Sequence, residues 1–248
     1  MHVFEKSLLL SFLSLIFVGT AAKADNSWST YHWSRMSNPF TLEVMDYMTP
    51  DWDGFLSLAA SDWSASVVLD TVVVPGADDR RARTKCEAVT GKLKACNAAY
   101  GRNGWLGLAQ IWLTSGHIIK ATTKVNDSYF NMSAYNNPNA KRHVLCQELG
   151  HDLGLDHQRE TTAVTCMNDI AGIFDPSYVS PNAHDFLQLE TIYGGHFDVA
   201  ASTSATSASS NQNENDQVPC ERGNGRSSVC VEALGHDSEL VTFVLWAE

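Results

Sequence analysis

The sequence predicts an α/β fold of the mixed (α+β) kind, in which a twisted sheet packs against a few helices. Strand-like and helix-like segments alternate in the first half of the chain, and helix-like segments dominate toward residue 193. The chain has 248 residues, which is enough for one domain with a substantial core and a small further piece. No repeat at the spacing of a solenoid is visible.

Apolar periodicity defines the predicted elements. Residues 39–47 predict a strand, and Thr49 and Pro50 predict a helix start with a capping hydroxyl and a proline in the first turn. From Trp52 to Trp63, apolar side chains recur at helical spacing on one face. The next strand is at 67–74, a polar loop holding Cys86 and Cys96 follows, and the remaining elements are strands at 106–113 and 117–126 and helices at 139–153 and 182–193.

The first 24 residues have the pattern of a secretory signal peptide. Lys6 precedes an apolar run over residues 8–18, and residues 22–24 supply small side chains in an A-x-A arrangement. A membrane anchor is the alternative, but the run is interrupted by Ser11 and is short for a span of about 20 residues. We therefore expect a secreted protein, extracellular or periplasmic, with no membrane association after cleavage.

The formal net charge of the full chain is −11, and removal of the signal peptide makes it one unit more negative. A chain this acidic is poorly suited to nucleic acid or to an anionic membrane surface. We expect a monomer with neither of these partners.

Composition divides the mature chain into a main domain and a small C-terminal part. The main domain is placed at 25–198, and a flexible linker is placed at 199–216 because residues 200–216 carry no large apolar side chain. Residues 217–248 are interpreted as a small β module with two strand-like runs around a turn at 235–238. A lone hairpin is marginal in water, so we expect it to pair with a neighbour or to depend on a disulfide, and to be dispensable for the main site.

The chain has six cysteines, which in an exported protein favours three disulfides. Six cysteines allow 15 pairings, so pairing of sequence neighbours is only a preference. A structural zinc site fits less well, because no C-x-x-C spacing occurs. The preferred pairs are Cys86–Cys96, Cys146–Cys166 and Cys220–Cys230.

The predicted helix at 139–153 carries the residues with the strongest chemical meaning. Gln147 and His151 are four apart and share a face, and Glu148 lies at the edge of that face. Gly154 then ends the helix, which lets His157 approach from a loop. Two imidazoles beside a carboxylate suit a catalytic zinc ion, whereas two unrelated surface histidines would match this spacing only rarely.

Residues 147–157, QELGHDLGLDH, resemble the metzincin zinc signature H-E-x-x-H-x-x-G-x-x-H, with glutamine in the first ligand position. Residues 165–169 resemble the Met-turn of that clan. Segments 107–112 and 116–126 resemble the edge strand and its neighbour in matrixin-like metalloproteases, and 183–195 resembles their closing helix. The resemblance implies a twisted mixed sheet with an active-site helix, a Met-turn and a closing C-terminal helix.

The resemblance also implies roles for individual residues. His151 and His157 would be zinc ligands, with Gln147 as a weak or substitute ligand, and Glu148 would be the general base. Met167 would form the floor of the site, and Cys146–Cys166 would join the helix to the Met-turn. The implied cofactor is Zn²⁺, and a structural Ca²⁺ stays open.

The predicted edge strand has a role of its own. Gly107, Leu108 and Ala109 would border the cleft and pair with the extended backbone of a substrate. The partner would then be a protein or peptide.

Three functions follow from these residues. The first is a secreted zinc-dependent endopeptidase that hydrolyses peptide bonds with Glu148 as general base. The second is an inactive fold that binds peptides or a partner protein. The third is a hydrolase that uses another metal, because the amide oxygen of Gln147 is a poorer zinc donor than an imidazole nitrogen and oxygen donors suit harder ions.

The histidines outside this motif are not expected to bind the metal ion. His143 lies eight residues before His151, or about 12 Å along a helix, so it cannot replace the missing ligand. His117 and His184 are near the starts of predicted elements and are expected to be surface or capping groups.

Overall fold

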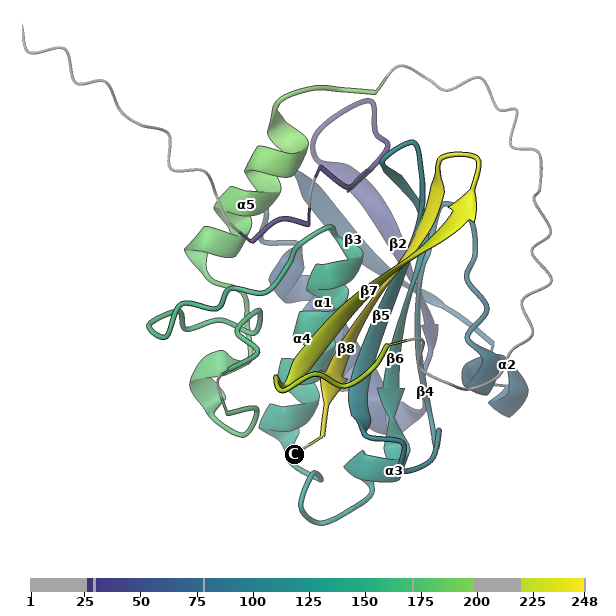
Figure 1. Cartoon of the computed structure of the whole chain (residues 1–248), viewed down its shortest axis with the longest axis vertical. Helices are drawn as coiled ribbons and strands as arrows, with labels where there is room; N and C mark the ends of the chain where they lie inside the picture. The colour runs from purple at the N-terminus through teal and green to yellow at the C-terminus, as the bar shows by residue number, and fades with distance from the viewer. Residues whose placement is uncertain (1–25, 29, 78, 171, 199–219, 248) are drawn as a thin grey trace, which may run out of the picture.

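The computed structural model describes residues 26–28, 30–77, 79–170, 172–198 and 220–247, and confirms the predicted fold class (Figure 1). An eight-stranded sheet has the strand order β3-β2-β4-β6-β5-β8-β7, and a short strand β1 pairs with β6. The strands are β1 (His32–Trp33), β2 (Phe40–Tyr47), β3 (Leu69–Pro75), β4 (Leu93–Ala98), β5 (Trp105–Thr114), β6 (His117–Asn126), β7 (Ser227–Gly235) and β8 (Ser238–Trp246). The helices are α1 (Pro50–Trp63), α2 (Arg80–Lys85), α3 (Asp127–Phe130), α4 (Pro138–Asp152), α5 (Ala183–Gly194) and a 3-10 turn η1 (Pro176–Tyr178).

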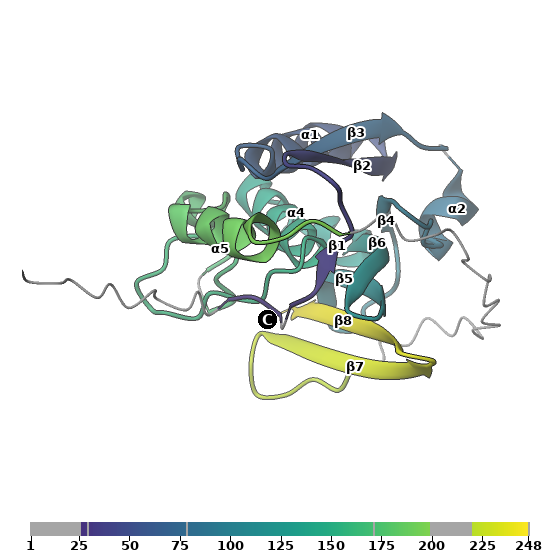
Figure 2. The same ribbon diagram turned by 90° about the horizontal axis from the view of Figure 1, so that it is seen from above.

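The sheet has a parallel half and an antiparallel half. The pairs β3–β2, β2–β4, β4–β6 and β1–β6 are parallel, whereas β6–β5, β5–β8 and β8–β7 are antiparallel. Figure 2 shows the strands stepping from β3 at one edge to β7 at the other, with α1, α4 and α5 gathered on one side. Helix α4 packs against β5 and β6, near the middle of the sheet.

Local chemistry explains where α4 begins and ends. The Asn137 side chain accepts hydrogen bonds from the backbone N–H groups of Asn139 and Ala140, and Pro138 occupies the first turn. The chain leaves the helix at Gly154, whose φ of +96° is strained for any other residue. A Cβ at Gly154 would also lie 2.4 Å from the backbone oxygen of Tyr31.

The core lies between the helices and the sheet, and it includes the tryptophans of the predicted apolar helix face. Trp52 is 2% exposed, and Trp63 is completely buried and donates its indole N–H to the carbonyl oxygen of Cys146 on α4. Tyr193 of α5 donates to the carbonyl oxygen of Leu153, which ties the closing helix to the end of α4. Apolar residues from α1, α4, α5 and the sheet therefore form one continuous core.

The three disulfides of the structure join the cysteine pairs that the sequence favours. Cys86 is bonded to Cys96, Cys146 to Cys166, and Cys220 to Cys230. No cysteine of the described part of the chain is left as a thiol. The first bond links the end of α2 to β4, and the second links α4 to the segment that carries Met167.

The structure corrects two details of the sequence interpretation and shows where the C-terminal hairpin pairs. The interval expected to be a polar loop contains β4, whose residues are buried between β2 and β6. The Thr49 side chain does not cap α1, because its hydroxyl accepts a hydrogen bond from Asn97 of β4 instead. Residues 227–246 form the expected hairpin, and β8 pairs with β5, so β5 is the neighbour that the hairpin was expected to need and the hairpin joins the main sheet.

Two predicted segments, the signal peptide at 1–24 and the linker at 199–216, lie outside the described residues. Among the helices that the structure does describe, none has the length and apolar character needed to cross a membrane.

Candidate functional site

Helix α4 holds the motif residues in a buried position. Gln147 and His151 are completely buried, and Glu148 is 1% exposed. After Gly154 the chain turns back, which brings His157, 4% exposed, against the end of the helix. The structure therefore places His157 against His151, with Gln147 and Glu148 one turn earlier on the same helix.

The two histidines face each other through their Nε2 atoms, which are 3.1 Å apart. His151 donates its Nδ1–H to the carbonyl oxygen of Leu155 at 2.8 Å, so its Nε2 carries a lone pair. His157 must then supply the proton of the Nε2–Nε2 contact. Burial and the neighbouring His157 ring lower the pKa of His151 well below its ordinary value, which favours the neutral imidazole that metal binding requires.

The other nitrogen of His157 faces a guanidinium group. The Nδ1 atom lies 2.9 Å from an Arg159 NH2 group, which can only donate. Asp156 Oδ1 and Asp169 Oδ2 lie 3.3 and 3.8 Å from the same nitrogen. If His157 moved its proton from Nε2 to Nδ1, it could donate to one of these carboxylates, and both Nε2 lone pairs would then face the space between the rings.

Gln147 and Glu148 are buried polar groups with few hydrogen-bond partners among the described residues. Both amide atoms of Gln147 have none, and the carboxylate of Glu148 has only a weak contact with the backbone N–H of Ala109. Glu148 lies against β5, because a Cβ added to Gly107 would meet its Oε1 at 2.5 Å. Burial raises the pKa of the Glu148 carboxyl well above its ordinary value, and the nearby Asp152 carboxylate raises it further.

Three of these residues, His151, His157 and Gln147, offer donor atoms for a metal ion. The distance between two nitrogens bound to one tetrahedral zinc is about 3.3 Å, close to the observed 3.1 Å. The orphaned Gln147 amide lies one helical turn from His151 and has no other use for its oxygen in the described structure. The donor set would be two imidazole nitrogens and one amide oxygen.

The segment that resembles a Met-turn lies under this helix. Met167 is completely buried, and its side chain packs against Gly150 of α4, where an added Cβ would collide with it. Its carbonyl oxygen accepts the backbone N–H of Gln158 at 2.8 Å, which couples the turn to the segment that carries His157. The Cys146–Cys166 bond fixes the two elements together covalently.

The expected substrate edge is not open, which corrects the role inferred for Gly107, Leu108 and Ala109. These residues pair with β6 on one side and with β8 on the other, so no backbone groups of this stretch face an empty edge. Phe243 of β8 lies opposite Ala109 and stacks on the His151 ring, with centroids 4.2 Å apart and planes 5° from parallel. The hairpin thus fills the position expected for a substrate and covers one face of a motif histidine.

The histidines outside the motif have different environments. His143 is completely buried, and its Nδ1 lies 2.6 Å from the carbonyl oxygen of Tyr178. Burial lowers the pKa of His143 to about 4. His117, expected to be a lone surface group, instead lies in a cluster with His32, His196 and Asp198. Sequence reasoning missed this cluster because its members come from three distant segments, and only the short spacing His196-x-Asp198 is visible locally.

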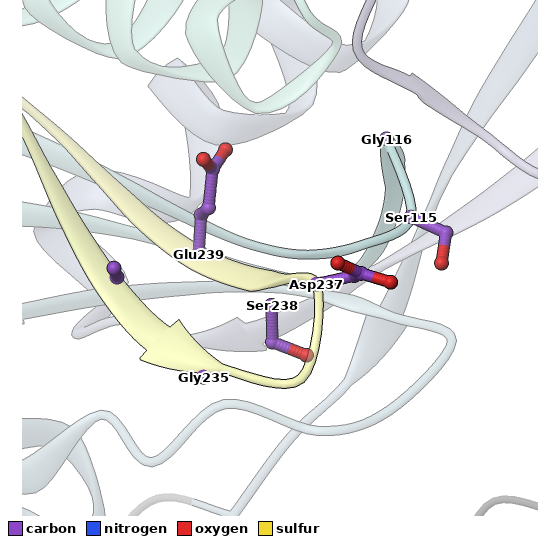
Figure 3. A pocket seen from close by; sticks show the side chains of 7 residues that line it. Ser115, Gly116, Gly235, Asp237, Ser238 and Glu239 are labelled. Atoms are coloured by element: carbon purple, nitrogen blue, oxygen red, sulfur yellow. The ribbon is translucent and has the colours of Figure 1, made fainter.

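The pocket in Figure 3 lies away from the motif histidines, at the β5–β6 and β7–β8 turns. Its lining residues are Ser115, Gly116, Ala233, Gly235, Asp237, Ser238 and Glu239. Ser238 is five residues from Phe243 along β8, or about 17 Å at about 3.4 Å per residue. The pocket therefore contributes nothing to the motif site.

Comparison with known proteins adds little to this description. No protein-family model matches the chain, and no curated protein matches its sequence. One matching solved structure is that of myroilysin, with 13% sequence identity, a TM-score of 0.37, and coverage of 66% of this chain and 83% of that chain. A likeness at this level carries no argument about fold or function, so the assignment depends on the residues themselves.

Proposed function

We propose that the chain is an exported zinc-dependent endopeptidase whose site consists of Gln147, Glu148, His151 and His157. The observation that supports this most strongly is the approach of two Nε2 atoms to 3.1 Å at the end of a helix that also carries the buried Glu148 carboxyl. The three disulfides support export, because such bonds persist in oxidising compartments.

His151, His157 and the amide oxygen of Gln147 would hold the zinc ion. When bound, zinc supplies Lewis-acid chemistry, which makes water a better nucleophile and polarises a peptide carbonyl. Leu155 orients His151 by accepting its Nδ1–H, and the Asp156 and Asp169 carboxylates would do the same for His157. The Arg159 guanidinium would have to move away from the Nδ1 atom of His157. Asp169 can hold it there, because its carboxylate already accepts a hydrogen bond from the Nε–H of Arg159 at 3.2 Å.

Glu148 would take a proton from the attacking water and pass it to the leaving amine. Burial beneath β5 disfavours the charged carboxylate, so Glu148 is a poor base in the closed arrangement. Access of water and substrate would rehydrate the carboxyl and lower its pKa toward the ordinary value. The proposal therefore requires the site to open before it can act.

The C-terminal hairpin would keep the peptidase latent. β8 occupies the edge of β5 where a substrate strand would pair, and Phe243 lies on His151. A peptide could add to β5 only after β8 leaves, by the strand-addition mode of recognition. The inferred activity is thus that of a chain whose own C-terminal strand takes the place of substrate.

The test is a chain with a recognition sequence for a site-specific protease inserted between residues 199 and 219. The zinc-loaded protein, cut and uncut, is assayed with an internally quenched peptide library, and size-exclusion chromatography reports release of residues 220–248. We expect hydrolysis only from protein that has released the hairpin, and we expect Glu148→Ala to keep the zinc and lose the activity. Released, folded and zinc-loaded protein that cleaves no peptide would contradict the proposal.

The second candidate is an inactive fold that binds peptides, and Gln147 is the residue that favours it. An amide oxygen is a weak zinc donor, so the site could have lost its metal while keeping its shape. Gln147→His distinguishes the two functions in the same assay. If only the variant hydrolyses peptides, the natural chain is an inactive binding protein.

A further inference from the structure

A second cluster of histidines lies outside the motif site. His32 is on β1, His117 is the first residue of β6, and His196 and Asp198 follow α5. His32 and His117 are direct partners in the parallel β1–β6 pair. Three segments separated by more than 70 residues each therefore converge at one point.

The converging atoms are three imidazole Nε2 atoms and one carboxylate oxygen. Asp198 Oδ1 lies 3.5 Å from His32 Nε2, 3.1 Å from His117 Nε2 and 3.7 Å from His196 Nε2. The Nε2 atoms of His32 and His196 are 3.2 Å apart. Ligand atoms around one tetrahedral zinc are separated by about 3.3 Å. Those of His32, His117 and Asp198 all lie within 4.8 Å of one another, and His196 lies at the edge of this group, against His32 and Asp198.

Outer groups hold two of the four side chains in the orientation that a metal needs. His32 donates its Nδ1–H to the carbonyl oxygen of Thr30 at 2.6 Å, which directs the Nε2 lone pair into the cluster. The Arg35 backbone N–H binds Asp198 Oδ2 at 2.9 Å, and the Arg35 guanidinium lies 3.5 Å from the same oxygen. Oδ1 is thereby left to face the histidines, as expected of a ligand supported by neighbouring groups.

With a neutral His32 and no bound cation, this arrangement brings two lone pairs together. His32 Nε2 is an acceptor once Nδ1 carries the proton, yet it faces Asp198 Oδ1, which is also an acceptor. Asp198 Oδ1 would in addition have to serve His117 and His196. One positive charge at the centre satisfies all four groups.

We propose that His32, His117, His196 and Asp198 form a structural zinc site. Imidazole nitrogens favour zinc over Mg²⁺ or Ca²⁺, and a closed set of four protein ligands is typical of structural rather than catalytic zinc. The His32 side chain is 9% exposed and that of His196 is 52% exposed, so the base of the site is fixed and the rim is accessible to an entering ion. Bound zinc would fasten β1 and β6 to the end of α5.

The inference does not depend on peptidase activity, and zinc binding tests it directly. Metal-free full-length protein is titrated with zinc chloride against a chromophoric chelator, and the visible spectrum of the cobalt-substituted protein reports tetrahedral coordination. We expect one zinc with a dissociation constant below about 1 µM at this site. Asp198→Asn and His196→Ala should each weaken that binding by at least about tenfold and diminish the tetrahedral cobalt bands.

His236→Asn is the matched control, because His236 is an exposed histidine in the β7–β8 turn and asparagine tolerates its φ of +50°. Circular dichroism confirms that each variant is folded, and His157→Ala identifies zinc bound at the motif site. If Asp198→Asn and His196→Ala bind zinc as tightly as the natural chain, the cluster is only a hydrogen-bonded network. Wild-type binding weaker than about 1 µM at the cluster also overturns the proposal.

Discussion

The molecule contains two groups of histidines that differ in almost every respect. The motif site is local in sequence, buried, and covered by β8, and it supplies only two imidazoles with a glutamine. The cluster of His32, His117, His196 and Asp198 is dispersed in sequence, lies at an accessible rim, and supplies three imidazoles with a carboxylate. The better set of zinc donors is therefore the one without a sequence motif.

Residue spacing and the quality of the donor atoms are separate kinds of evidence for a metal site. Spacing on α4 shows that two side chains share a face, but it does not show what covers them. The covering strand β8 comes from more than 80 residues further along the chain. The following experiments test whether β8 covers the motif site and whether the dispersed histidine cluster is accessible to zinc.

Phe243→Ala has the largest expected effect. Phe243 is completely buried, stacks on His151 and meets Trp28 edge to face, so its removal leaves a cavity beside the motif site. We expect the free energy of unfolding to fall by about 3–5 kcal/mol in denaturant titrations. Val231→Ala on β7, 50% exposed, is the control and should change stability by about 0.5 kcal/mol at most. A loss below about 1 kcal/mol for Phe243→Ala would mean that β8 does not cover His151 in solution.

Removal of the Cys146–Cys166 bond comes next. Its residues are 20 apart, and a loop of this length restricts the unfolded chain by about 3 kcal/mol. We expect the double substitution to alanine to lower stability by about that amount and to loosen the segment of Met167 against α4. Hydrogen exchange of residues 165–169 measures the second effect. Unchanged exchange would show that packing at Gly150 alone fixes the turn.

Zinc removal should cost somewhat less. At about 100 times its dissociation constant, zinc should raise the free energy of unfolding by about 2.7 kcal/mol, and a chelator should reverse this. The increment should be lost in Asp198→Asn and kept in His157→Ala if the stabilising ion is in the dispersed cluster. The opposite pattern would place it in the motif site. Only the increments are compared, because each substitution has its own effect on stability.

Glu148 should give the metal-free protein a pH dependence. Its pKa is raised in the folded state, so the folded protein keeps a proton that the unfolded chain releases above about 4.5. Stability from this group is therefore present below that pH and is lost as pH rises toward the folded pKa, by at most about 1.4 kcal/mol per pH unit. Glu148→Gln should remove this loss of stability. The variant's free energy of unfolding, relative to that of the wild type, should therefore increase between pH 5 and pH 7. A difference in unfolding free energy between the variant and the wild type that does not change with pH would indicate that Glu148 is hydrated.

Arg159→Gln should have the smallest effect. Arg159 donates to His157 Nδ1 in the structure and so favours the tautomer that cannot bind metal through Nε2. Loss of one such hydrogen bond, worth about 1 kcal/mol, should tighten zinc binding at the motif site about fivefold. The measurement uses an Asp198→Asn background, with Arg142→Gln on α4 as the control. Weaker binding would mean that Arg159 helps to orient His157.

Local pattern in the sequence was enough to predict β5, β6, α4 and α5 nearly to the residue. Each of these elements has its own periodicity, and α4 also has a proline and a glycine at its two ends. β4 escaped prediction because it is short and buried on both sides, and it carries Lys94 and Asn97 in place of an alternating pattern. The approach of His157 to His151 was likewise predictable, since the turn at Gly154 leads the chain back to the end of the helix.

Only the tertiary structure decided what surrounds these residues. The pairing of β8 with β5 depends on a register between strands more than 120 residues apart, and nothing in either strand names its partner. The tautomer of His157 depends on Arg159 and Leu155, which act through hydrogen bonds in three dimensions. The dispersed histidine cluster needs β1, β6 and the end of α5 to meet, because metal coordination requires atoms within a few ångströms of one another, and sequence spacing predicts such proximity only within a single element or turn.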